Sequence, residues 1–176
     1  AICIEIDNKF QDLSYEISEN IKIRIVTTKD LDALHILRHS SAHILAQAVL
    51  NLYPNAQFGV GPSIENGFYY DFLFETPIKE NELENIEKEM KRIAKSAQSF
   101  IRSEITKKDA VKIFKNQKLK LELIESAESD EGVGEEIVST YANDEFIDLC
   151  MGPHVPSTSV LTVSYTHLTL PTSAIV

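Results

Sequence analysis

The chain of 176 residues is 43% hydrophobic and carries 17 basic against 27 acidic residues, a formal net charge of −10. This composition predicts one or two folded domains with a real core and excludes an intrinsically disordered chain. No stretch approaches the roughly 20 apolar residues of a membrane helix, no leader sequence opens the chain, and the two cysteines lie far apart. We therefore expect a cytoplasmic protein without a membrane partner or a disulfide framework.

The N-terminal residues alternate between apolar and other side chains. Residues 1–6 and 21–25 both follow a period of two, and residues 7–9 have the composition of a turn between strands. Residues 1–29 are therefore predicted to form a small β-rich piece with one face against a core. Because the chain opens within a strand and without Met, we expect this piece to be the end of a longer domain.

A long helix is predicted from about Leu31 to Tyr53, where Pro54 stops it. Its apolar residues recur at helical spacing and form one stripe. His39 and His43 lie almost opposite that stripe, on a face with almost no charge. This face is therefore expected to line a cleft or to pack against another layer, rather than to meet bulk water.

The rest of the chain mixes strands with shorter helices. Alternating side chains predict strands over residues 67–74, 118–124, 137–141 and 146–150. Helices are predicted over residues 83–97 and directly after Thr106, a helix cap, and residues 126–136 are predicted to be an acidic loop. Because no regular strand-helix-strand rhythm is present, the predicted fold class is α+β with a largely antiparallel sheet.

The charge is distributed unevenly along the chain. Residues 121–149 carry ten acidic residues and no Lys or Arg, whereas residues 88–120 carry eleven basic against three acidic residues. A basic face of this kind could bind a polyanion such as a nucleic acid. The alternative is a solvated helix surface without a partner.

Two pairs of side chains have the composition of a metal or catalytic site. His39 and His43 are four residues apart and share one helical face, and Cys150 and His154 flank the bend predicted at Gly152-Pro153. Imidazole and thiolate are the usual ligands of zinc, so the spacing alone predicts a tetrahedral zinc site. The alternatives are structural histidines and a core cysteine.

Several motifs carry a family resemblance. RHSSAHILAQA at 38–48, GP at 61–62, NGFYYD at 66–71 and DLCMGPHVP at 148–156 together resemble the editing domain of bacterial threonyl-tRNA synthetases. Residues 1–29 resemble the C-terminal part of the β-grasp TGS domain that precedes it, and residues 30–161 resemble the editing domain. Alanyl-tRNA synthetases share the editing fold but match less well, because their editing module has no TGS piece in front. Residues 162–176 fit nothing in the family and look like translated adapter sequence.

The resemblance implies a hydrolytic site that removes serine from mischarged tRNA(Thr). One methyl group distinguishes threonine from serine by only about 1–3 kcal/mol, so a second, hydrolytic site has to complete the selection. By resemblance, His39 would activate or orient water, and Lys120 would face the charge that develops on the carbonyl oxygen. His43, Cys150 and His154 complete the catalytic set that the resemblance implies, and Tyr70 and Asp148 would bind the substrate.

The resemblance also implies cofactors and partners. Threonyl editing sites work without a bound metal, so a metal-free pocket is favoured; related alanyl domains hold zinc, and zinc at His39, His43, Cys150 and His154 is the alternative. The class II core of the family, which binds ATP, Mg and Zn, lies outside this chain, so threonine activation is not expected. The implied partners are the 3′ end of tRNA(Thr) carrying serine and the remainder of a homodimeric synthetase. Two further hypotheses are a zinc-stabilised tRNA-binding module without catalysis and an inactive truncated product.

Overall fold

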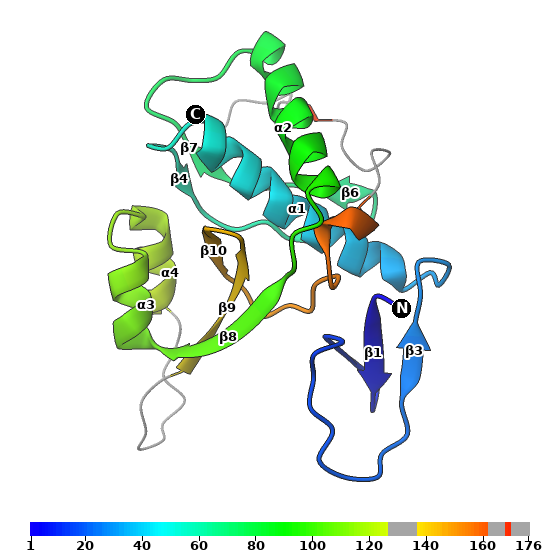
Figure 1. Cartoon of the computed structure of the whole chain (residues 1–176). Coiled ribbons are helices and arrows are strands. Elements are labelled where there is room, and N and C mark those ends of the chain that lie inside the picture. The colour runs from blue at the N-terminus through cyan, green and yellow to red at the C-terminus, as the bar shows by residue number, and fades with distance from the viewer. Residues whose placement is uncertain (127–136, 162–167, 170–176) are drawn as a thin grey trace.

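The computed structural model describes residues 1–126, 137–161 and 168–169, and it shows small antiparallel sheets gathered around one long helix, α1 (Figure 1). Two sheets have three strands, in the orders β2-β1-β3 and β10-β9-β8, and two more have two strands each, β4-β7 and β5-β6. Every strand pairing in the described part of the chain is antiparallel. The predicted α+β class is confirmed.

Helix α1 (Ala33–Leu52) lies at the centre and is buried around most of its circumference. A helix with apolar residues on all sides belongs inside a protein, and α1 carries only one charged residue, Arg38. The face opposite the apolar stripe also avoids bulk water, as predicted, because Ser40, His43 and Gln47 are buried there. Of the helices in the described residues, none is long and apolar enough to cross a bilayer.

The N-terminal sheet consists of β1 (Cys3–Ile6), β2 (Lys9–Gln11) and β3 (Arg24–Val26). Asp7 and Asn8 have positive φ angles in the predicted turn between β1 and β2, the conformation that tight hairpins require. The third strand begins later than predicted, and its buried residue is Val26, whereas Ile25 is 59% exposed. The prediction erred because Ile21 to Ile25 alternates regularly, but the packing against the core follows the opposite phase.

The second three-stranded sheet consists of β8 (Ile101–Thr106), β9 (Ile137–Asn143) and β10 (Phe146–Leu149). The predicted strands over 137–141 and 146–150 are confirmed within one or two residues. Strand β8 was not predicted, because its side chains are mostly exposed and show no apolar alternation. The predicted helix after Thr106 is α3 (Lys107–Ile113), and the Thr106 hydroxyl accepts a hydrogen bond from the Asp109 N–H.

Two predicted strands are wrong. Residues 118–124 form a helix, α4 (Lys118–Ser126), because Lys120 and Ile124, four residues apart, are the two buried side chains. The Gln57 side chain also accepts the Lys118 N–H at the first turn of this helix. Residues 67–74 do not form one strand but two short ones, which pair with different partners, and Tyr70 lies between them.

The remaining elements frame α1. They are β4 (Gln57–Phe58), β5 (Ser63–Ile64), β6 (Gly67–Phe68), β7 (Phe72–Leu73), the 3-10 turns η1 (Glu80–Glu82) and η2 (Thr158–Val160), and helix α2 (Leu83–Lys95). Helix α2 packs across α1 through Ile86, Met90 and Ile93, which confirms the predicted amphipathic helix (Figure 1). The predicted loop over 126–136 falls almost entirely outside the described residues.

Candidate functional site

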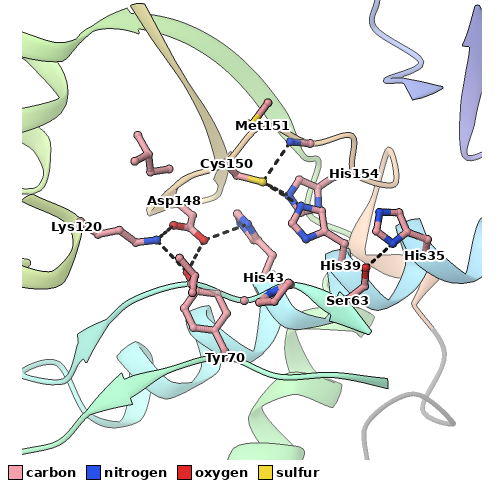
Figure 2. Close-up of a pocket in the computed structure, with 15 residues that line it drawn as sticks. His35, His39, His43, Ser63, Tyr70, Lys120, Asp148, Cys150, Met151 and His154 are labelled. Carbon is pink, nitrogen blue, oxygen red and sulfur yellow. Dashed lines mark hydrogen bonds and ion pairs between the residues drawn. The ribbon is translucent and has the colours of Figure 1, made fainter. Parts of the chain in front are cut away.

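A cavity of about 480 Å³ opens beside α1, and all seven residues singled out in the sequence line it (Figure 2). They come from four parts of the chain: His39 and His43 from α1, Tyr70 from the β6–β7 connection, Lys120 from α4, and Asp148, Cys150 and His154 from β10 and the loop that follows. The volume suits a small-molecule site. The two motifs about a hundred residues apart therefore meet in one place.

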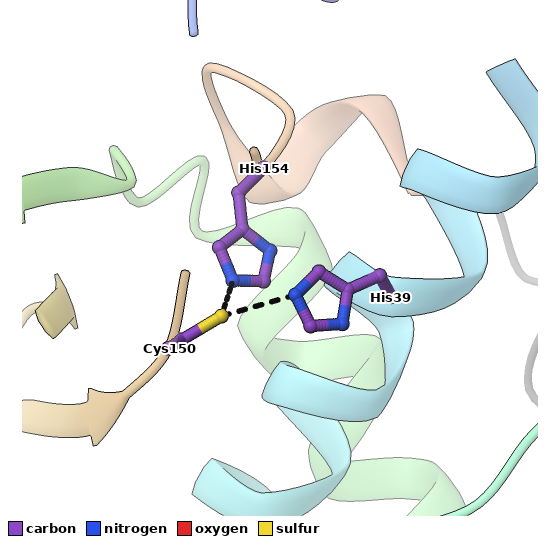
Figure 3. Close-up of side chains that lie close together, drawn as sticks. All are labelled: His39, Cys150 and His154. Carbon is purple, nitrogen blue, oxygen red and sulfur yellow. Dashed lines mark hydrogen bonds between the residues drawn. The ribbon is translucent and has the colours of Figure 1, made fainter. Parts of the chain in front are cut away.

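At one end of the cavity, two imidazoles approach the Cys150 thiol (Figure 3). His39 Nε2 lies 3.0 Å from Cys150 Sγ, and His154 Nε2 lies 3.3 Å from the same atom. The Gly152 N–H donates to Sγ at 3.3 Å. The three side chains therefore form one cluster, which we call the imidazole–thiol cluster.

The His154 ring is held on both faces and at one nitrogen. It stacks on His39 with ring centroids 4.5 Å apart and on Phe100 with centroids 4.7 Å apart. Its Nδ1 lies 3.0 Å from the Ser40 hydroxyl, which also accepts the Val155 N–H. This packing fixes the ring plane and turns Nε2 toward Cys150.

Burial keeps the imidazole–thiol cluster uncharged. Desolvation lowers the pKa of His39, and it lowers the pKa of His154 further, with His43 and His39 adding to the effect. Desolvation, followed by the charge of Asp148, raises the pKa of Cys150 to about 12. At neutral pH this end of the cavity therefore holds neutral imidazoles, which can accept protons, and a protonated thiol.

At the other end, Lys120 and Asp148 form a buried ion pair with 2.5 Å between Nζ and Oδ1. The Lys120 ammonium also donates to the Gly59 carbonyl at 2.6 Å and to the Tyr70 hydroxyl at 3.1 Å. Tyr70 in turn donates to Asp148 Oδ2 at 2.6 Å, and burial raises the pKa of this phenol, so it remains a donor. The Lys120 ammonium therefore makes two hydrogen bonds and one ion pair in what we call the Lys120 network.

His43 lies between the two groups. Its Nδ1 is 4.0 Å from Asp148 Oδ2, and its ring meets the edge of His154 with centroids 4.8 Å apart. Among the described residues, neither ring nitrogen has a hydrogen-bond partner at ordinary geometry, although the side chain is 98% buried. Desolvation lowers its pKa to about 4. A buried polar ring without a partner has unused capacity for a water or a ligand.

Two glycines permit close contacts at the cavity wall. A Cβ at Gly61 would lie 2.0 Å from the Tyr70 ring, and a Cβ at Gly152 would lie 1.9 Å from the Tyr141 hydroxyl. Gly152 also has a φ of +72°, which L side chains rarely adopt, and it precedes a cis bond to Pro153. The bend predicted at Gly152-Pro153 is confirmed.

Three of the four predicted zinc ligands are grouped. The ligand atoms of His39, Cys150 and His154 all lie within 4.8 Å of one another, and the Ser40 contact to the far nitrogen of His154 is the kind of outer hydrogen bond that orients a ligating imidazole. The group could bind a metal such as zinc. His43 is not part of this group; its Nδ1 lies 4.0 Å from Asp148 Oδ2.

Four residues of the site were missed in the sequence. Ser40 lies inside the first motif, and its place beside His39 could have suggested a role. Gly59 acts through its carbonyl, and Tyr141 and Asp12 act through contacts between distant segments, so the sequence carries no signal for them.

Comparison with known proteins identifies similar chains. The chain is 47% identical over 158 residues to a threonine–tRNA ligase of Francisella philomiragia, 42% over 161 residues to one of Desulforapulum autotrophicum, and 45% over 165 residues to one of Ralstonia nicotianae. The matches cover 89%, 92% and 93% of this chain but only 24%, 24% and 25% of these relatives. The chain thus spans about a quarter of the length of the relatives that it matches. No model of a known protein family matches it.

Proposed function

Because the chain is homologous to part of the threonine–tRNA ligases, we propose that its cavity hydrolyses tRNA(Thr) that carries serine by mistake. On the same premise, residues 30–161 are the editing domain and residues 1–29 the end of a TGS domain. One observation carries the proposal: neutral imidazoles and a fixed positive charge line the same cavity of about 480 Å³. Ester hydrolysis needs this combination of a proton acceptor and stabilisation of a developing oxyanion.

In this mechanism His39 takes a proton from the attacking water. Its lowered pKa keeps the ring neutral at pH 7, so the unprotonated ring nitrogen can take up a proton once water replaces its present contact. The stack against His154 fixes the plane of the His39 ring, so a water bound to its nitrogen approaches the substrate from one direction. The water oxygen attacks the ester carbonyl, and the 3′-terminal ribose oxygen of the tRNA leaves with a proton that an imidazolium returns.

Cys150 does not act as the nucleophile in this mechanism. A thiol attacks as its thiolate, and reactive cysteines have a lowered pKa, whereas burial raises the pKa of Cys150 to about 12. The thiol instead lies in the cavity wall, where Nε2 of both stacked imidazoles, His39 and His154, approaches its sulfur. Hydrolysis by water, without an acyl-enzyme, fits this electrostatic environment.

The Lys120 network binds the seryl group. Asp148 offers its carboxylate to the substrate ammonium, and the buried Lys120 charge favours the developing oxyanion from a fixed position. Two hydrogen bonds and the ion pair with Asp148 hold the Lys120 ammonium in place, so its effect on the substrate is electrostatic rather than a direct hydrogen bond.

The proposal is tested by deacylation of the two charged forms of tRNA(Thr). The 176-residue chain is expected to release serine from Ser-tRNA(Thr) at least tenfold faster than threonine from Thr-tRNA(Thr), with and without EDTA. Equal rates with both substrates, or no release above the uncatalysed rate, would contradict the proposal and leave the inactive truncated product as the better hypothesis.

A second candidate is a zinc-stabilised tRNA-binding module, which the grouping of His39, Cys150 and His154 favours. Bound there, zinc would supply a Lewis acid and would require Cys150 to lose its proton. Metal analysis of the purified chain distinguishes the two. One zinc per chain, lost in Cys150→Ser together with the folded state, would support the module, and a folded metal-free chain would exclude it.

A further inference from the structure

The N-terminal sheet contributes a carboxylate to the loop that carries Cys150 and His154. Asp12 directly follows β2, in the segment predicted to belong to a separate domain. Its Oδ1 accepts the His154 N–H at 3.0 Å, and its Oδ2 accepts the Tyr141 hydroxyl at 2.5 Å. These partners are 142 and 129 residues away in sequence. One side chain therefore joins the N-terminal sheet, the β8–β9–β10 sheet and the loop.

We propose that Asp12 is a positioning residue, which reaches the site from the N-terminal sheet and holds the Cys150–His154 loop in its working geometry. The inference rests on the proposed function, and it assigns part of that function to a segment outside the cavity. Asp12 itself does not line the cavity, so it acts through the loop and not on the substrate.

Tyr141 is the residue through which Asp12 also constrains the bend of the loop at Gly152. Its ring is 1% exposed, meets the edge of His154 with centroids 4.6 Å apart, and occupies the space where Gly152 would carry a side chain. Burial, and then the Asp12 carboxylate, raise the pKa of Tyr141, so its hydroxyl stays protonated and donates to Asp12. With both partners held, the loop can neither rotate at Gly152 nor lift away from β9.

Among the residues that the structure describes, the loop has no comparable anchor on the solvent side. Met151, at its tip, is 89% exposed, and Gly152 offers no side-chain contact. The contacts that fix the two ends of the loop are the Ser139–Cys150 hydrogen bonds at β10 and the Asp12 and Ser40 contacts around His154. Loss of the Asp12 contacts should therefore move His154 Nε2 relative to Cys150 Sγ and leave the other side chains that line the cavity in place.

The experiment compares Asp12→Ala and Asp12→Asn in the 176-residue chain, with Glu16→Ala, an exposed acid on the same segment, as the matched control. Asn keeps an oxygen for the His154 N–H and can donate to the Tyr141 oxygen, so it preserves the positions while removing the charge. Two readouts are used. One is kcat and KM for deacylation of Ser-tRNA(Thr), and the other is the rate at which iodoacetamide alkylates Cys150 and Cys3, followed separately by peptide mass spectrometry.

We expect Asp12→Ala to lower kcat at least tenfold with KM within threefold of wild type, and to raise alkylation of Cys150 at least fivefold while Cys3, buried in the same N-terminal sheet as β2, stays protected. Asp12→Asn should remain within threefold of wild type in both readouts. The inference is overturned if Asp12→Ala behaves like Glu16→Ala, or if Asn fails to rescue.

Unfolding and failure of the proposed function give separate signals. If Cys3 also becomes reactive in Asp12→Ala, the sheet has opened, and Tyr141→Phe then decides, because it removes one of the two hydrogen bonds to Asp12 and keeps the ring under Gly152. A threefold or greater loss of kcat in Tyr141→Phe supports the inference, and full activity overturns it. If wild type does not deacylate Ser-tRNA(Thr), the proposed function fails, and the Cys150 alkylation rates alone decide the role of Asp12.

Discussion

At one end of the cavity Lys120 and Asp148 form a buried ion pair, whereas at the other end the imidazoles and the thiol are neutral and contact one another. Lys120 and Asp148 are buried, as is His154, whereas His39 and Cys150 keep some exposure to solvent. The two ends differ in how they reduce the unfavourable free energy of burying ionisable groups. In the Lys120 network the opposite charges are paired and hydrogen-bonded, whereas the groups of the imidazole–thiol cluster are in their neutral forms.

This contrast divides the work between stability and chemistry. A buried ion pair that further hydrogen bonds support resists displacement and suits a binding wall. Neutral imidazoles can accept a proton and therefore suit proton transfer. His43, which has no hydrogen-bond partner among the described residues, lies between the Lys120 network and the imidazole–thiol cluster. If the division is correct, substitutions at one end should change mainly the free energy of unfolding, and substitutions at the other mainly the rate.

The largest effect is expected for Lys120→Met. Removal of the ammonium leaves the Asp148 carboxylate buried without its counter-charge, so the free energy of unfolding should fall by about 3–5 kcal/mol. Urea denaturation followed by circular dichroism measures it. Lys88→Met, which breaks an exposed pair with Glu84, is the matched control and should change little. A Lys120→Met chain as stable as the control would show that the network does not support the fold.

His39→Ala should act on the rate instead. The loss of the proton acceptor is expected to lower the rate of deacylation of Ser-tRNA(Thr) at least tenfold. The urea midpoint of unfolding should stay close to that of wild type, because the His39 side chain is only half-buried. Asn51→Ala, near the exposed end of the same helix, is the control and should retain activity. Unchanged hydrolysis in His39→Ala would remove the catalytic role from this residue.

The sequence predicts this contrast only in part. Helix α1, and with it the pair His39 and His43, could be located because a 20-residue apolar pattern followed by a proline predicts a single buried helix. The bend at Gly152-Pro153 was equally clear. The family resemblance also predicted that Lys120 belongs to the site, but the secondary structure around it was predicted wrongly. Residues 118–124 alternate like a strand, whereas Lys120 reaches the cavity from a helix.

The features that the sequence cannot predict are polar contacts between residues far apart in the chain. The hydrogen bonds of Asp12 to Tyr141 and His154 depend on how two sheets pack, and a lone Asp after a short strand has no pattern that marks it. The three partners of Lys120 include a backbone carbonyl, which every residue has. The neutral state of the imidazoles likewise follows from burial, which only the folded chain determines.

Gly152→Ala tests whether the imidazole–thiol cluster depends on the shape of its loop. The substitution places a Cβ against the Tyr141 hydroxyl at a φ of +72°, so we expect a loss of about 1–3 kcal/mol in the free energy of unfolding and a slower deacylation. Gly59→Ala is the control, because its Cβ would meet its neighbours at 3.5 Å or more, an ordinary contact distance. Equal stability of the two variants would contradict the proposed constraint.

The pH dependence of stability should reveal the neutral imidazoles. The pKa of His43 is about 4 in the folded chain and about 6.5 when unfolded, so between these values the unfolded chain binds the proton and the folded chain does not. The free energy of unfolding should therefore fall as the pH drops from 6.5 to 4, by about 1.4 kcal/mol per pH unit for this residue. His43→Phe, whose ring would join Phe100 and Phe146, should flatten this slope. An equally steep slope in His43→Phe would assign the effect to other groups.

The smallest effect is expected outside the cavity, at the basic side chains of residues 88–118, which unlike Lys120 do not line the cavity. Much of their charge is already paired, since Lys88, Arg92, Arg102 and Lys112 each contact a carboxylate. Lys108 on α3 and Lys115 just after it are exposed. The hypothesis that this basic face binds nucleic acid predicts that Lys108→Glu with Lys115→Glu weakens tRNA binding a few-fold and makes it less sensitive to salt. Because both lysines lie outside the cavity, kcat at saturating Ser-tRNA(Thr) should not change. Unaltered affinity across salt concentrations would return this face to solvated surface, and a fall in kcat would show that the cavity and this surface are coupled.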